Sequence, residues 1–213
     1  MSATSAEVRA PLEPVARSFF ERPTQVVARD LLGLWVLRST ADGLTGGPIV
    51  ETEAYGGPED LASHARAGLT RRTTPMFGEP GHAYVYLVYG MHECLNVVAY
   101  SDAAAGAVLI RAIAPGVGVD EVRQRRSRPT DPPHRLCSGP AMVCQGLAVD
   151  RTFDGHDLTL GEGLWLARPA EAPALEIASG PRIGVDYAGL WAAKPWRFWV
   201  GGSRSVSRPG ART

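Results

Sequence analysis

Apolar segments rich in β-branched and aromatic residues come in neighbouring pairs along this sequence, each pair joined by a short turn. Residues 34–39 and 48–55 predict two strands connected through Asp42-Gly43, a dipeptide typical of tight hairpins. Residues 83–90 and 94–100 predict a second hairpin. Strands that pair with their neighbours along the chain run antiparallel. The pattern therefore predicts an α+β fold, a single mixed domain with a central, mainly antiparallel curved sheet, surrounding helices and a protruding β-hairpin.

The remaining predicted elements are scattered between these strands and leave no room for a linker. They are helices over 24–32, 119–127 and 139–149, a short helix or turn over 58–66, and strands over 106–114, 163–169 and 197–202. A chain of 213 residues suits one domain. We place it at 16–202, with a flexible N-terminus over 1–15 and a flexible basic tail over 203–213.

Composition and charge exclude several classes of protein. No run approaches the roughly 18 apolar residues of a membrane helix, and the first 20 residues have acids and prolines where a signal peptide would be apolar. We therefore expect a cytoplasmic protein with no membrane partner. The 22 basic and 22 acidic side chains give no net charge, which argues against an extended nucleic-acid coat.

A strand that carries two carboxylates and a phenol on one face is the first candidate site. In the segment 50–55, Glu51, Glu53 and Tyr55 alternate with smaller side chains and so share a face. This is the pattern of a solvated edge strand or of a carboxylate in a cleft that acts as a general base. Spacing alone leaves both readings open.

The predicted second hairpin carries aromatic side chains up to its tip. Tyr84 and Tyr86 point to one face, and Tyr89 lies at the turn, followed by Met91 and His92. An exposed aromatic side chain there could stack on a nucleobase or wedge into a duplex. The alternative is a tip that docks against another part of the protein.

Two further polar residues interrupt apolar segments. Arg111 lies within VLIRAIAP and needs an anionic partner, which could be Glu51, Glu53 or a phosphate. Asn96 interrupts CLNVV in the same way. A metal site could be imagined from Glu51, His64 and His92, but their spacing matches no helix-borne ligand pair, so we expect none.

Seven stretches, in a fixed order, match one known family. They are ARDLLG (28–33), VETEAYGGPEDLASHA (50–65), MFGEPGHAYVYLVYGMHECLNVV (76–98), VLIRA (108–112), LCSGPAMVCQGLAV (136–149), RIGVDYAG (182–189) and KPWRFWV (194–200). Over about residues 20–202 the chain resembles the alkyladenine DNA glycosylase family, the single-domain 3-methyladenine DNA glycosylases that lack a helix-hairpin-helix. The resemblance implies a monomer without cofactor that hydrolyses the N-glycosidic bond of damaged purines, 3-methyladenine and 7-methylguanine first, with hypoxanthine and ethenoadenine as candidates.

The resemblance also assigns roles to single residues. It implies that Glu53 activates water and that Arg111 helps to position it. The flipped base would lie in a pocket formed by Tyr55, His64, Tyr86 and Asn96. The gap left in the duplex would be filled by Tyr89.

The implied partner is double-stranded DNA that contains damaged purines, in a bacterial-type cytosol near the nucleoid. Met91 and His92 would lie beside the minor groove, although mammalian relatives have tyrosine at position 92. Arg72 would reach a phosphate, in a loop that departs from the family pattern. Because no lysine lies in the matched site, we expect a monofunctional enzyme with no Schiff base.

Three alternatives belong to other classes. The chain could be a lesion-binding module without catalysis, a metal-dependent hydrolase, or a relative of the formyl-transferase C-terminal domain that shares the architecture. Glu53 argues against the first and the aromatic hairpin tip against the third.

Overall fold

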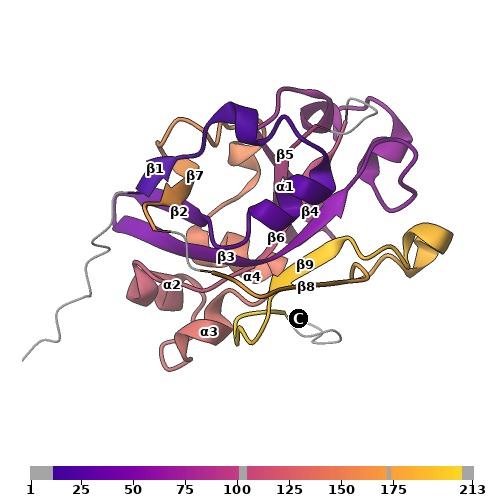
Figure 1. Ribbon diagram of the computed structural model, residues 1–213. Coiled ribbons are helices and arrows are strands. Elements are labelled where there is room, and N and C mark those ends of the chain that lie inside the picture. The colour runs from indigo at the N-terminus through magenta and orange to yellow at the C-terminus, as the bar shows by residue number, and fades with distance from the viewer. Residues whose placement is uncertain (1–11, 101–104, 172–173, 208–213) are drawn as a thin grey trace, which may run out of the picture.

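The computed structural model describes residues 12–100, 105–171 and 174–207, in which nine strands form one curled sheet (Figure 1). The strands are β1 (Leu12–Pro14), β2 (Trp35–Thr40), β3 (Gly43–Tyr55), β4 (Ala83–Val88), β5 (His92–Val98), β6 (Ala107–Ile113), β7 (Leu164–Pro169), β8 (Ile177–Gly180) and β9 (Arg197–Val200). The main path runs β1-β7-β2-β3-β6-β5-β4, and β9 pairs with β3 and with β8. Every pairing between these strands is antiparallel. The predicted α+β class with a curved antiparallel sheet is confirmed.

Strand β3 is longer than the sequence predicts and joins the two halves of the sheet. Its first half pairs with β2, with Thr40 opposite Gly43, as the predicted hairpin requires. Its second half lies between β6 and β9. The register with β6 shifts on both sides of Glu51, which marks irregular pairing of the kind that often lies beside functional sites. This strand therefore brings the acidic segment between two strands that are distant in sequence.

Within the described residues, four α-helices cover the sheet. They are α1 (Thr24–Asp30), α2 (Val119–Arg125), α3 (Pro133–Leu136) and α4 (Pro140–Leu147). In Figure 1, α1 lies on one side of β3, and α2, α3 and α4 lie on the other. Helix α1 begins after Pro23, and α4 has Pro140 in its first turn, where the missing N–H costs nothing. Helices α1, α2 and α4 confirm three of the predicted helices, and each is slightly shorter than expected.

Five short 3-10 helices complete the described fold. They are η1 (Arg17–Phe19), η2 (His64–Ala67), η3 (Thr74–Phe77), η4 (Arg151–Phe153) and η5 (Asp186–Trp191). The predicted short helix or turn over 58–66 is a series of turns that leads into η2. No helix among the described residues combines the length and the apolar character needed to cross a membrane.

The described parts of both chain ends contact the rest of the fold, and the flexibility expected for 1–15 and 203–213 stays a prediction. Residues 1–11 and 208–213 lie outside the described residues. Strand β1 pairs with β7, and Ser205 and Ser207 are buried near the C-terminal end. The reason is hydrogen bonding that the sequence pattern does not reveal: Ser207 binds a buried carboxylate of β3.

Candidate active site

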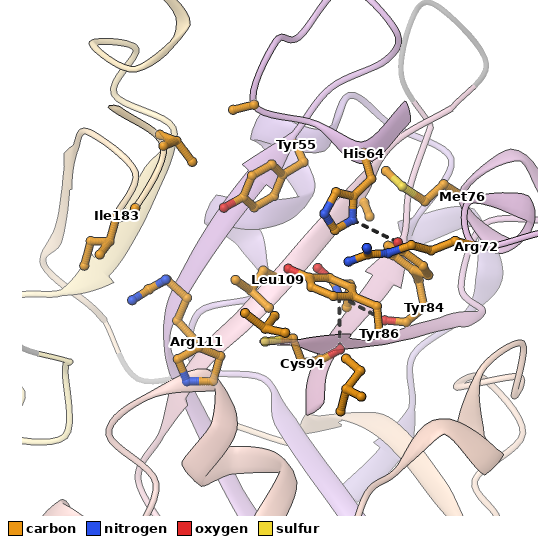
Figure 2. Close-up of a pocket in the computed structure, with 18 of the residues that line it drawn as sticks. Tyr55, His64, Arg72, Met76, Tyr84, Tyr86, Cys94, Leu109, Arg111 and Ile183 are labelled. Atoms are coloured by element: carbon orange, nitrogen blue, oxygen red, sulfur yellow. Dashed lines mark hydrogen bonds between the residues drawn. The ribbon is translucent and has the colours of Figure 1, made fainter. Parts of the chain in front are cut away.

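A cavity of about 380 Å³ opens between the second half of β3, the β4–β5 hairpin and the segment that follows β8. Seven of the ten residues to which the resemblance assigns roles line it: Tyr55, His64, Arg72, Tyr86, Tyr89, Asn96 and Arg111. Figure 2 shows Tyr55, Tyr86 and Arg111 converging from three different strands, with His64 and Arg72 beside them. Glu53 lies directly behind this lining, because it is hydrogen bonded to Tyr55 and Arg111. Met91 and His92 line a different, smaller hollow.

Glu53 is completely buried and is held by three donors among the described residues. The Tyr55 hydroxyl donates to Oε2 at 2.7 Å, and Nη1 of Arg111 donates to the same oxygen at 3.2 Å. The backbone N–H of Ile183 donates to Oε1 at 2.7 Å. A carboxylate has about four acceptor positions, so one remains for a further donor such as water. The three donors all line the cavity, which places the carboxylate one layer behind its wall.

Arg111 bridges the two carboxylates of β3. Its Nε donates to Glu51 Oε1 at 3.0 Å, while Nη1 donates to Glu53. Burial alone would lower the pKa of Arg111, but the negative charges of Glu53 and Glu51 outweigh it and raise the pKa above its ordinary value. The guanidinium therefore stays charged. Of the partners that the sequence left open, the structure pairs Arg111 with both glutamates.

Tyr55 forms one wall of the cavity and keeps its proton. Burial, followed by the charge of Glu53, raises the pKa of the Tyr55 phenol well above its usual value. Behind the ring lies Arg182, whose guanidinium carbon is 4.8 Å from the ring centroid. Arg182 forms a fully buried ion pair with Asp60 at 2.6 Å and 2.9 Å. This pair holds the Tyr55 ring in place. It also fixes Ile183, which follows Arg182 in the chain.

His64 and Tyr86 form the opposite wall (Figure 2). Their ring centroids are 4.6 Å apart in an edge-to-face arrangement, and Nδ1 of His64 lies 2.9 Å from the Tyr84 hydroxyl. Burial, followed by the positive charge of Arg72, lowers the pKa of His64 to about 4. The imidazole is therefore neutral at pH 7. Two aromatic walls and a neutral histidine suit a flat ligand that carries positive charge.

Asn96 is fixed by the backbone at the floor of the cavity. Its Nδ2 donates to the carbonyl of Tyr84 at 2.9 Å and to that of Cys94 at 3.3 Å. These bonds tie the side chain across β4 and β5, so its orientation does not depend on a ligand.

The tip of the β4–β5 hairpin is exposed and has an unusual backbone. Tyr89 has φ 53° and Gly90 φ 74°, and the Met91 N–H donates to the Val88 carbonyl at 3.1 Å. A positive φ is rare for a bulky residue and often marks a functional position. The Tyr89 side chain is 89% exposed and that of Met91 70%. The tip does not dock against the described part of the protein, which removes that alternative.

Arg72 lies at the mouth of the cavity. Its guanidinium carbon is 5.3 Å from the centroid of the Tyr86 ring. A phosphate contact for Arg72 stays a prediction. In this structure its charge faces an aromatic wall.

The imagined metal ligands do not meet. Glu51 is occupied by Arg111, Arg197 and Ser207, and His64 by Tyr84. Within residues 12–100, 105–171 and 174–207, no group of three or more His, Cys, Asp or Glu side chains could hold a metal ion.

Comparison with known proteins gives one consistent family. Residues 18–204 match the family model described as methylpurine-DNA glycosylase. Proteins named putative 3-methyladenine DNA glycosylase from Methanocella arvoryzae and Myxococcus xanthus are each 45% identical, over 90% and 92% of this chain and 94% and 95% of theirs. The chain belongs to the methylpurine-DNA glycosylase family. The DNA-3-methyladenine glycosylase of Mus musculus is also 45% identical, over 89% of this chain, which spans 60% of the mouse protein.

Membership in this glycosylase family makes the chain a hydrolase that acts on N-glycosyl bonds in DNA. It also separates the chain from the formyl-transferase domain considered from sequence. The sequence missed three contributors to this candidate site: the Ile183 N–H, the Asp60–Arg182 pair and Ser207. A backbone donor leaves no side-chain signal, and the other contacts join residues more than 100 positions apart.

Proposed function

We propose that this chain is a monofunctional DNA-3-methyladenine glycosylase of base excision repair, which flips a damaged purine out of duplex DNA and hydrolyses its N-glycosidic bond. The first substrates are 3-methyladenine and 7-methylguanine, with hypoxanthine and ethenoadenine as candidates for test. One observation carries the proposal: the Glu53 carboxylate lies directly behind an aromatic cavity, with one acceptor position left for water. The enzyme acts as a monomer.

Eversion of the base is supported by the exposed hairpin tip. A base inside a duplex is inaccessible at its sugar, so the enzyme has to extrude it, at a cost of a few kcal/mol. Tyr89, which is 89% exposed and lies at the rim of the cavity, fills the gap and offsets part of this cost. Met91, beside it, contacts the groove. His92 pairs with Val88 directly next to this tip and, with Met91, lies beside the minor groove.

Selectivity comes from charge and shape more than from hydrogen bonds. An N3- or N7-alkylated purine in DNA carries positive charge, which the faces of Tyr55 and Tyr86 stabilise by about 0.5–2 kcal/mol. The neutral His64 adds no repulsion. Such bases also leave readily, because departure from the sugar neutralises them. Asn96, held rigidly by backbone carbonyls, limits which purine edges fit.

The hydrolysis needs one water and one base. Glu53 accepts a proton from water while the water oxygen bonds to the sugar C1′, and the C1′–N bond breaks with its electron pair passing to the purine. The carboxylate also stabilises the positive charge that develops on the sugar, as in glycoside hydrolysis. Arg111 holds the Glu53 side chain in place and helps to orient the water. The only lysine, Lys194, packs on Trp191 with Nζ 3.6 Å from the ring centroid, and it does not line the cavity.

The test is base release by the Glu53→Gln variant. Glutamine keeps the size of the side chain but is a very weak base, so we expect release of 3-methyladenine from duplex DNA to fall by at least about 100-fold. Binding to a duplex that contains the lesion should persist. Turnover close to that of the wild type would refute the role of Glu53. Binding without release by the wild type itself would favour the lesion-binding module.

A further inference from the structure

Glu51 is buried as deeply as Glu53 but is set back from the cavity. Its side chain is fully buried and accepts four hydrogen bonds from described residues. Oε1 receives Nε of Arg111 at 3.0 Å, Nη1 of Arg197 at 3.3 Å and the Ser207 hydroxyl at 2.8 Å. Oε2 receives the backbone N–H of Ser207 at 2.7 Å. Four donors already hold this carboxylate behind Arg111, so its effect on the cavity is exerted through its neighbours.

Arg111 is the neighbour that reaches the reacting group. Three of its nitrogens each face a different residue: Nε faces Glu51, Nη1 faces Glu53, and Nη2 faces the Ser207 hydroxyl at 3.3 Å. A guanidinium is planar, so three fixed contacts determine the position of the whole group. Two of them depend on Ser207, one directly and one through Glu51.

The balance of charge makes the Ser207 contacts important. Glu51 and Glu53 share the Arg111 guanidinium, at 3.0 Å and 3.2 Å, and Glu51 has Arg197 at 3.3 Å as its second cation. The N–H and the hydroxyl of Ser207 satisfy part of the Glu51 charge. Without the hydroxyl, Glu51 relies more on Arg111 and draws it from Glu53, because a buried carboxylate needs its donors.

We infer that Ser207 and Glu51 position Arg111 against the water-activating Glu53, so that the segment 203–207 completes the active site. The inference rests on the proposed function. The segment comes from the far end of the described chain, which turns back after β9 (Figure 1), and Ser207 lies 156 residues from Glu51. Ser207 and Glu51 are positioning residues, since both reach Glu53 only through Arg111.

The experiment compares three variants at two neighbouring serines. Ser207→Ala removes the hydroxyl and keeps the N–H, whereas Ser207→Thr keeps both. Ser205→Ala is the matched control: Ser205 is 4% exposed and Ser207 7%, and among the described residues Ser205 makes no hydrogen bond to Glu51 or Arg111. For each variant, single-turnover release of 3-methyladenine and the dissociation constant for a lesion duplex are measured.

We expect Ser207→Ala to slow release about tenfold, the scale of one hydrogen bond to a charged group, with the dissociation constant unchanged. Ser207→Thr should restore most of the rate, and Ser205→Ala should match the wild type. Equal slowing by both alanine variants, or no slowing by Ser207→Ala, would overturn the inference. Base release by the wild type tests the proposed function. The positioning role is tested separately, by the release rates of the variants relative to one another.

Discussion

The Asp60–Arg182 ion pair is expected to be the most sensitive point of this structure to a single substitution. Both side chains are completely inaccessible to solvent, and Arg182 makes two bonds to the Asp60 carboxylate. Asp60 also accepts the N–H groups of Gly56 and Ala62 at 3.0 Å each. Asp60→Ala would leave a buried guanidinium and two backbone donors without their acceptor.

The expected cost is large compared with the stability of a domain. Breaking a buried ion pair on one side destabilises by about 3–5 kcal/mol, out of a typical total of about 5–15 kcal/mol. For a chain of this length, this corresponds to a melting temperature lower by about 6–20 °C. The release rate should fall as well, because Arg182 precedes Ile183, whose N–H binds Glu53.

The assay is urea unfolding followed by tryptophan fluorescence. Trp196 is a local reporter, since the Arg182 guanidinium carbon lies 5.1 Å from its ring centroid. Asp120→Ala provides the control: Asp120 is paired with Arg123 at 2.6 Å, but its side chain is 88% exposed, so its loss should cost less than about 1 kcal/mol. A loss of less than about 1 kcal/mol for Asp60→Ala would refute the reasoning.

Three further predictions concern the cavity and its rim. Tyr89→Ser should weaken binding to a lesion duplex, measured by fluorescence anisotropy, by about tenfold or more. It should affect base release from single-stranded DNA much less. Equal effects on both would contradict the insertion of Tyr89 into the duplex. Arg72→Gln should raise the ratio of 7-methylguanine release to ethenoadenine release severalfold. The reason is that the positive charge of Arg72, 5.3 Å from the centroid of the Tyr86 ring, opposes a cationic base. The control is Arg71→Gln, which should leave the ratio unchanged because Arg71 does not line the cavity. His64 has a pKa of 6.5 when unfolded and about 4 when folded, so the unfolded chain takes up the proton first and stability should fall as the pH drops from about 6.5 to about 4. Unfolding curves for His64→Gln should lack this part of the slope.

Local sequence patterns were sufficient for the hairpins and for most of the helices. Alternating apolar residues and turn dipeptides depend on neighbours along the chain, which is why the β2–β3 and β4–β5 hairpins were predicted. The first part of β3 was missed because its glycines carry no alternation. A Cβ at Gly47 would lie 2.0 Å from the Ala114 carbonyl oxygen, so the strand forms there by close approach of the backbone, which no periodicity reveals.

The candidate site shows the same limit: some of its residues could be predicted from the sequence and others could not. Tyr55, Tyr86 and Arg111 stood out by their position in the sequence pattern, the family resemblance added His64, and the structure brings all four to one cavity. The donors that bind Glu53 and Glu51 from the far end of the described chain could not be predicted from the sequence. The Ile183 N–H is chemically the same as any other backbone amide, and only the fold distinguishes it.

The placement of β3 between β6 and β9 has a consequence for how the enzyme is made. A ribosome that has completed β3 has produced both carboxylates, but Arg111 follows 58 residues after Glu53, and Ile183 follows 130 residues after it. Until those residues emerge from the ribosome, burying the acidic segment would leave two carboxylates in the interior without their donors. Nascent chains should therefore keep this part of β3 solvated, and the proposed catalytic centre should form late, after the last strands have emerged.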